Sequence, residues 1–334
     1  MNKSLLNDLL KNYEQMRIDN SKKLENRKID LYKKEPRLQE IANEINSSSI
    51  SIAKNILKSN NSNEIEKLQN NIKKLNEEKL VILKKLGKAP DYLSNIYTCE
   101  NCKDTGYILD KDFKTNMCNC LKQKLFNIEY NKSSLSNIEK QNFNYFNENL
   151  YSDIVDEKKY FSSISPRENI LDIKTAAEQF INNFDNPEEK NLIFSGGTGL
   201  GKTFLSNCIV NELLKKGKTV MYQTAPVMLD SLISDLFAKP GEQKNLSENL
   251  LSVDLLVIDD LGTETINSMK FTELYKIINT RLLSQNGKIT KTIISTNLNL
   301  KSLLKTYDER LISRFVGYYN VYRFYGDDIR FKIK

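Results

Sequence analysis

The sequence predicts an α/β fold, a parallel sheet with crossover helices, preceded by a helical N-terminal region that ends in a cysteine cluster. Beyond Pro187, short apolar runs alternate with longer helical stretches, a pattern typical of parallel strands joined by helices. Four of the five cysteines lie between Cys99 and Cys120, and a chain of 334 residues is long enough for two domains. We expect a helical or coiled-coil region at 1–92, a four-cysteine module at 93–125, a connector with a linker helix at 126–185 and the α/β domain at 186–334.

The N-terminal region reads as helices separated at Pro36, and the last of them carries an apolar seam. Its apolar residues follow heptad spacing, with Lys79 interrupting one position. They are Ile65, Leu68, Ile72, Leu75, Ile82 and Leu86. Such a seam indicates either an amphipathic helix packed within its own domain or a coiled coil that binds a partner. The sequence leaves both interpretations open.

The composition excludes several classes of protein. Hydrophobic residues make up 39% of the chain and charged residues 28%, and residues 1–23 contain no apolar stretch long enough for a secretory signal or an anchor. We therefore expect a cytoplasmic protein with no membrane partner. Histidine is absent, which excludes mechanisms that need an imidazole base or ligand. The net charge of +7 is only a weak indication of nucleic-acid binding, since a small basic surplus is usually a solvated helix surface.

Four short apolar runs are the expected strands, and the first leads into a phosphate-binding loop. The runs are 191–195, 219–223, 255–259 and 291–296. Gly196-Gly197-Thr198-Gly199-Leu200-Gly201-Lys202-Thr203 matches G-x-x-x-x-G-K-[ST] at every fixed position, and a helical pattern follows. Small residues let backbone N–H groups surround phosphates at the start of a helix. Lys202 is expected to reach the β- and γ-phosphates of ATP, and the Thr203 hydroxyl to bind Mg²⁺.

Two acids follow the third expected strand. Because open α/β sheets bind ligands at the carboxyl ends of their strands, Asp259 and Asp260 should lie beside the phosphate loop. We assign Asp259 to Mg²⁺, directly or through water, and Asp260 to polarising the water that attacks the γ-phosphate. The alternative is that two acids after an apolar strand only cap a helix.

Further polar residues complete the expected active site. Asn297 follows the fourth strand, where its amide could hold the attacking water or contact the γ-phosphate. Arg310 and Arg314 are four residues apart and therefore share one face of a helix. Arginines spaced in this way often form only surface salt bridges. An arginine supplied in trans instead stabilises transition-state charge, which makes self-assembly a condition for hydrolysis.

The cysteine cluster has the spacing of a metal site. Cys99-x2-Cys102 and Cys118-x-Cys120 are separated by fifteen residues and offer four thiolates, enough for a closed tetrahedral zinc site. Closed sites of this kind are structural, so we expect Zn²⁺ to fold a small knuckle and not to catalyse. Four reduced cysteines without metal and an iron–sulfur cluster are the alternatives.

These blocks, in this order and spacing, resemble those of AAA+ ATPases, and residues 95–334 are most similar to bacterial helicase loaders of the DnaC/DnaI type. The resemblance implies that Asn297 is the first sensor and Arg330 the second. It also implies that Arg314 is the arginine finger, with Arg310 beside it in the same box. An abbreviated or missing helical lid is implied as well, since few residues follow Arg314.

The same resemblance implies a function. It indicates an ATP-dependent loader that binds the hexameric replicative helicase through its N-terminal region, where the DnaI type carries zinc, and single-stranded DNA through its AAA+ domain. We expect the DNA contact along residues 222–237, where aromatic and polar groups can meet bases. Most AAA+ motors carry Glu at the position of Asp260, so slow, partner-dependent hydrolysis is expected.

Two other functions fit the same motifs. The ATPase helper of a transposition system has a nucleotide domain that looks much the same, and a zinc-stabilised adaptor would bind ATP but barely hydrolyse it. The four-cysteine region behind a long helical N-terminus favours the loader. A GTPase is disfavoured because no Asn-Lys-x-Asp motif occurs.

Overall fold

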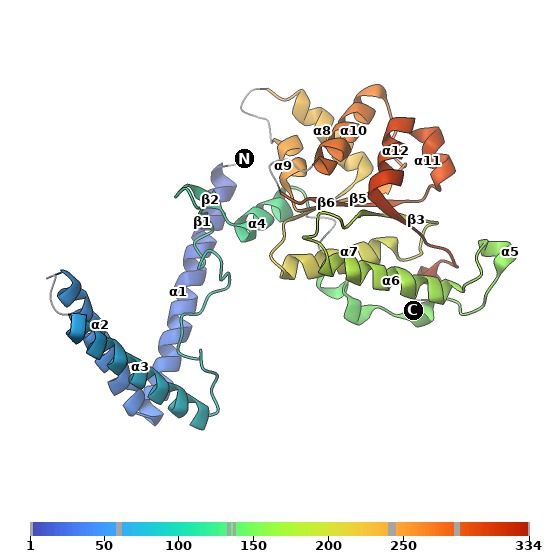
Figure 1. Cartoon of the computed structure of the whole chain (residues 1–334). Helices are drawn as coiled ribbons and strands as arrows, with labels where there is room; N and C mark the ends of the chain where they lie inside the picture. Colours follow the sequence, from blue (N-terminus) through green and yellow to red (C-terminus); the bar gives the residue numbers. More distant parts are fainter. Residues whose placement is uncertain are drawn as a thin grey trace. The chain divides into compact units, whose positions relative to one another are not determined.

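The computed structural model describes residues 3–57, 62–131, 135, 138–239, 245–283 and 288–332. The chain divides into two compact units, residues 7–116 and residues 117–334 together with 1–6. Figure 1 shows the helices of the first unit and the α/β architecture of the second. Within the described ranges, none of the helices combines the length and the apolar character needed to cross a bilayer.

The first unit consists mainly of three helices, α1 (Lys3–Lys34), α2 (Arg37–Leu57) and α3 (Ser62–Lys85). The break expected at Pro36 is present between α1 and α2. Helices α2 and α3 pack against each other, and the Arg37 guanidinium bridges them with a two-bond fork to the Glu78 carboxylate, at 2.8 and 3.0 Å. From the predicted seam Leu75 is buried, and Ile82 and Leu86 pack against a cluster formed by Leu31, Leu38 and the completely buried Leu83. Part of the apolar seam is therefore buried by packing within this unit.

A small hairpin follows the first cysteine pair. It comprises β1 (Tyr107–Leu109) and β2 (Thr115–Met117), two strands too short for the sequence pattern to reveal. Helix α4 (Asn119–Glu129) begins directly after Cys118.

The second unit is built on a five-stranded sheet in the order β4-β5-β6-β3-β7, and every pair of neighbours is parallel. The strands are β3 (Asn191–Ser195), β4 (Val220–Thr224), β5 (Leu255–Leu261), β6 (Lys291–Thr296) and β7 (Tyr319–Arg323). The predicted parallel sheet is confirmed. The sequence reading missed β7, because this edge strand alternates buried and exposed residues and carries no continuous apolar run.

Helices cover both faces of this sheet, as Figure 1 shows. One face carries α6 (Pro166–Asn182) and α7 (Lys202–Lys215). The other carries α8 (Ala225–Leu236), α9 (Leu246–Ser252), α10 (Ser268–Leu282), α11 (Leu300–Thr306) and α12 (Glu309–Tyr318). Successive residues of β5 point to opposite faces of the sheet. Val257 packs toward α7 on one face, and Ile258 packs toward α8 on the other. Burial on both faces explains the continuous apolar runs of the central strands. Short elements lie outside these layers: α5 (Glu157–Tyr160), η1 (Ile138–Lys140), η2 (Phe143–Tyr145), η3 (Glu148–Leu150) and η5 (Ile329–Lys332).

Side chains near α4 protect the free edge of β4. The Gln123 amide bonds to Val220 N–H and C=O at 2.6 and 3.0 Å, and Asn131 accepts from Tyr222 N–H at 2.9 Å. These side chains occupy backbone groups that a neighbouring strand would otherwise pair with.

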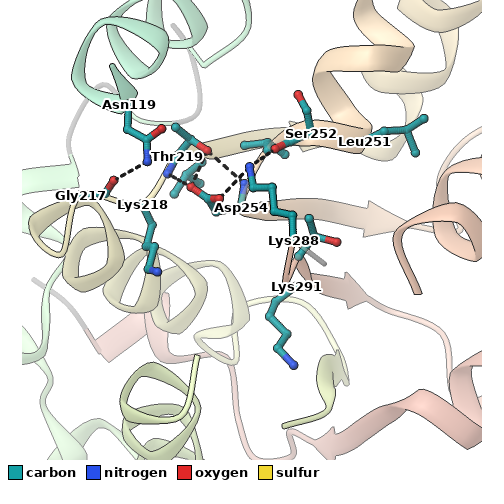
Figure 2. A network of polar contacts seen from close by, with 12 residues as sticks. Asn119, Gly217, Lys218, Thr219, Leu251, Ser252, Asp254, Lys288 and Lys291 are labelled. Atoms are coloured by element: carbon teal, nitrogen blue, oxygen red, sulfur yellow. Dashed lines mark hydrogen bonds and ion pairs between the residues drawn. The ribbon is translucent and has the colours of Figure 1, made fainter. Parts of the chain in front are cut away.

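A polar network joins the amino ends of β4 and β5 (Figure 2). The Asp254 carboxylate accepts from the backbone N–H and the hydroxyl of Thr219, both at 2.7 Å, and from Lys288 Nζ at 2.9 Å. Burial raises the pKa of Asp254, but these hydrogen bonds outweigh it and hold the pKa below its ordinary value. The network sets the relative position of the two strands whose opposite ends form the site described next.

Candidate nucleotide-binding site

The predicted phosphate loop connects β3 to α7 and has the geometry that its glycines allow. Gly199 and Gly201 have φ angles of +69° and +90°, and Gly201 stands directly before the first residue of α7. A Cβ atom at Gly201 would lie 2.4 Å from the Tyr151 hydroxyl, and one at Gly199 would lie 1.9 Å from Asp328 Oδ1. Any side chain would therefore collide with residues that pack on the loop.

Lys202 is buried against the loop that precedes it. Its ammonium donates to the carbonyl oxygens of Gly196 and Gly197, both at 2.7 Å, and to Asn297 Oδ1 at 2.9 Å. Burial lowers the pKa of Lys202, while the carboxylates of Asp260 and Asp259 act in the opposite direction. The structure thus brings together the lysine and the amide that the sequence placed 95 residues apart.

Asp259 lies at the centre of a hydroxyl network. Its Oδ2 accepts from Tyr222 Oη at 2.7 Å and from Thr203 Oγ1 at 3.2 Å, and its Oδ1 accepts from Ser295 Oγ. Burial and the nearby Asp259 carboxylate raise the pKa of Tyr222, so the phenol is a donor at neutral pH. Carboxylate and hydroxyl oxygens suit Mg²⁺, and the two residues assigned to that ion, Thr203 and Asp259, are in contact.

Asp260 occupies an unusual backbone position for an acid. Its φ angle is +55°, and the pairing of β5 with β6 shifts register between Ile258 and Leu261. The shift directs successive carboxylates differently: Asp259 is buried, while Asp260 is half-buried and lines the cavity. Burial and the Asp259 carboxylate raise the pKa of Asp260, which makes it a stronger base than an exposed aspartate.

A cavity of about 460 Å³ adjoins the loop, and its lining combines polar and aromatic side chains. This volume is in the range of small-molecule sites. The lining includes the predicted residues 198–203, Asp260, Asn297 and Arg330. The rest of the lining, called the aromatic lining below, consists of residues that the sequence analysis did not assign to the site: Tyr145, Phe146, Asn147, Leu150, Tyr151, Phe204 and Ile329. The one available signal was the concentration of aromatic residues in the Asn-rich segment 126–185.

Two elements brace the loop from outside. Tyr151 Oη donates to the Leu200 carbonyl at 3.1 Å, and Ile329 N–H donates to the Gly199 carbonyl at 2.9 Å. Arg330 lines the cavity, and its guanidinium is paired with Asp328 at 2.6 Å. The predicted second sensor is thus close to the site but held by a neighbouring acid.

Arg310 and Arg314 lie on α12 and are not among the described residues that line the cavity. Arg310 pairs with Asp308 at 2.9 Å and is exposed. Arg314 is half-buried and donates through Nε to Asn279 Oδ1 at 3.0 Å. Neither arginine serves the nucleotide cavity of its own chain in this arrangement, so the finger role stays a prediction about a neighbouring copy.

The segment expected to contact DNA is only partly accessible. Tyr222 is 2% exposed and its hydroxyl is bonded to Asp259, so a base-stacking role for this residue is wrong. Tyr222 lies on β4 and its ring is buried on the side of the sheet that α7 covers. The sequence alone did not reveal which way this side chain points. Phe237, at the other end of the segment, is 73% exposed.

The four cysteines of the predicted zinc site converge. Their sulfur atoms all lie within 4.8 Å of one another, compatible with the separation of about 3.8 Å found in tetrahedral zinc–thiolate sites. Cys102 Sγ accepts from Gly106 N–H at 3.3 Å, so the turn after the first cysteine pair packs against this sulfur. The buried Asp104 carboxylate holds the first knuckle by accepting from Cys99 N–H at 2.7 Å and from the Asn20 amide at 3.0 Å. The cluster could bind a metal, and its thiolates fit zinc.

We expect one zinc ion per chain by elemental analysis, and none after combined Cys99→Ser and Cys102→Ser substitution. Loss of two thiolates leaves too few ligands for a closed site, so the knuckle should unfold. Cys208→Ala is the control, because this buried cysteine lies in α7, outside the cluster. Metal-free protein, purified under reducing conditions with the knuckle intact, would rule out the zinc site.

Comparisons with known proteins agree with this geometry. Residues 160–317 match the family described as IstB-like ATP binding protein. The replicative helicase loader DnaC of Escherichia coli (strain K12) is 34% identical over 139 residues, which are 41% of this chain and 54% of DnaC. DnaC of Buchnera aphidicola subsp. Schizaphis graminum (strain Sg) is 29% identical over 140 residues, 42% of this chain and 55% of that protein.

Among solved structures, a crystal structure of the DnaC helicase loader is similar at 25% identity and a TM-score of 0.41, covering 55% of this chain and 99% of that chain. A crystal structure of DnaI is similar at 21% identity and a TM-score of 0.41, covering 57% and 100%. The chain spans about half the length of the curated relatives that it matches. From its matched sequence, its phosphate loop and its five-stranded parallel sheet, this chain carries an IstB/DnaC-like AAA+ domain.

Proposed function

We propose that this chain is an ATP-dependent loader that places the replicative helicase on single-stranded DNA. The observation that carries the proposal is a single cavity that unites the phosphate loop with Asp260 and Asn297, in a domain 34% identical to DnaC. The helical region and the four-cysteine cluster, which lie outside the matched residues 160–317, supply the part that holds the partner. We place this activity in the cytoplasm.

ATP binds with its base against the aromatic lining of the cavity and its phosphates at the loop. Tyr145 is 64% exposed and offers a ring face, while Phe146 and Leu150 give apolar contact. Lys202 exchanges its carbonyl contacts for the β- and γ-phosphates, and the backbone N–H groups of 198–203 surround the phosphate oxygens.

Hydrolysis requires an oriented water and charge neutralisation. When bound, Mg²⁺ neutralises the charge of the β- and γ-phosphates. Thr203 and Asp259 are the residues that hold it, Asp260 accepts a proton from the attacking water, and Asn297 positions that water. The Asp260 carboxylate is one methylene shorter than Glu, so hydrolysis is slow until a partner adjusts the site. Arg314 of an adjacent copy completes the site in the assembled form, with Arg310 beside it and Arg330 as the second sensor.

The alternative function is an ATPase helper of a transposition system. The match to the IstB-like ATP binding protein description favours it, because that family covers the nucleotide-binding residues 160–317. The two functions differ in the partner of residues outside this range, so a binding experiment with the helicase separates them.

We expect the full chain to co-elute with the hexameric replicative helicase of its host in size-exclusion chromatography, with and without ATP. Loss of the nucleotide site by Lys202→Ala should leave this complex intact, since the helicase contact lies in the N-terminal region. Val81→Asp on α3 should weaken it, because Val81 is an exposed apolar residue of the helical unit. The buried Leu75 is unsuitable as a probe, because a charge there would disrupt α2–α3 packing.

Val155→Asp is the matched control, since this exposed valine lies in the second unit. Circular dichroism should show equal helix content for both variants. If the full chain folds and shows no affinity for the helicase at micromolar concentration, the loader assignment fails and the transposition function becomes the better explanation.

A further inference from the structure

Tyr222 directs its hydroxyl at the acid assigned to magnesium. The 2.7 Å bond from Tyr222 Oη to Asp259 Oδ2 is shorter than the 3.2 Å contact from Thr203 to the same oxygen. We infer that Tyr222 is a positioning residue for the nucleotide-bound metal: it orients Asp259 so that the carboxylate faces Mg²⁺. The inference rests on the MgATP site of the proposed function and extends it to a residue that belongs to none of the sequence motifs.

The register of the sheet creates this contact. Tyr222 on β4 is paired with Val257 on β5, and Asp259 lies two residues further along β5 on the same face. A diagonal neighbour of this kind is within reach of a long aromatic side chain. Ser295 approaches from the other side at the level of Asp259, because both residues lie two positions beyond the Val257–Ile293 pair. Asp259 is therefore held between hydroxyls from both adjacent strands.

Packing alone does not account for a tyrosine at this position. The ring lies in the apolar layer between the sheet and α7 with Val257, Ile293 and Leu205. A phenylalanine would fill that layer equally well, whereas a buried hydroxyl is costly unless it is hydrogen-bonded. The Tyr222 hydroxyl donates its hydrogen bond to Asp259, so the role of this oxygen is to hold the Asp259 carboxylate.

The two hydroxyls on Oδ2 differ in what they do when metal enters. Thr203 is the second residue of α7, is exposed and lines the cavity, so its hydroxyl can turn to the metal. Tyr222 is enclosed and cannot leave Asp259 without leaving the core. Tyr222 is thus the donor that keeps the carboxylate oriented while Thr203 binds the ion. Partners of this type outside the ligand set typically contribute about 10–100-fold to metal affinity.

The test compares Tyr222→Phe with wild type in the full-length protein by calorimetric titration of ATP, first in EDTA and then over a series of Mg²⁺ concentrations. We expect unchanged ATP affinity in EDTA, because the phosphate loop is untouched. The Mg²⁺ concentration that half-restores tight binding should rise about tenfold or more. A purely structural tyrosine would change both conditions equally or neither.

Tyr319→Phe is the matched control. Tyr319 is also a buried sheet tyrosine, but it stands at the beginning of β7 beside Asn191, at the opposite end of the strands from the phosphate loop. It should leave the Mg²⁺ dependence unchanged. Tyr222→Met, which fills the space without a hydroxyl, repeats the test if the phenylalanine variant unfolds. An unaltered Mg²⁺ dependence in folded variants overturns the inference, whereas wild-type protein that binds no MgATP overturns the proposed nucleotide function itself.

Discussion

Lys202→Ala is expected to abolish nucleotide binding, with ATP affinity falling by at least about 100-fold. The ammonium is the buried cation of the cavity, and its removal leaves the β- and γ-phosphate charge without its main partner. Isothermal titration calorimetry with MgATP gives the affinity directly. The fold should survive, because Lys202 contacts only loop carbonyls and Asn297 among the partners described for it.

Lys215→Ala serves as the control for this experiment. Lys215 ends the same helix, is solvent-exposed and pairs with Glu212, so its loss removes one positive charge without touching the loop. ATP affinity within twofold of wild type is expected for it. Wild-type affinity in Lys202→Ala would refute the phosphate-loop assignment.

Arg314→Ala is expected to bind ATP like wild type and to lose its stimulated hydrolysis by about 10³-fold or more. The arginine lies on α12, outside the cavity of its own chain, so ground-state binding does not depend on it. Stabilisation of the transition-state charge does depend on Arg314, once a second copy presents this guanidinium to the γ-phosphate. Phosphate release in the presence of single-stranded DNA and the helicase measures the effect.

Mixing the variants distinguishes action in trans from a folding defect. Arg314→Ala supplies an intact phosphate loop, and Lys202→Ala supplies an intact Arg314. An interface between one copy of each variant can therefore contain both, so the mixture should recover part of the activity. Arg314→Lys should not recover it, because an ammonium lacks the planar fork of a guanidinium. Wild-type hydrolysis by Arg314→Ala would place the finger elsewhere, with Arg310 the next candidate.

Much of the nucleotide-binding domain was readable from the sequence. The expected strands and the loop between β3 and α7 follow from local pattern: continuous apolar runs mark strands buried on both faces, and glycines mark positive φ angles. The four-cysteine cluster was equally local, since two close pairs need only one hairpin between them to meet. The roles assigned to individual site residues stay predictions.

The apolar seam of the N-terminal helices was ambiguous in the sequence because heptad spacing is the same whether the partner is internal or external. Leu75 is buried, and Ile82 and Leu86 pack against the cluster of Leu31, Leu38 and Leu83, which shows internal use of part of the seam. Val81 remains exposed on the same helix. The spacing of apolar residues in a sequence indicates that one face of a helix is apolar, but only the contacts in the structure show what covers that face.

The sequence by itself determined the glycine-rich loop, the two acids near the end of β5 and the two cysteine pairs, because each is a short motif whose residues are close together in the chain. Only the tertiary structure decided what surrounds them. The aromatic lining of the cavity comes mainly from residues 145–151, and the donor on Asp259 comes from Tyr222, 37 positions earlier. Strand order and register bring these side chains together. Both are set by long-range packing of crossover helices, which leaves no periodic trace in the local sequence.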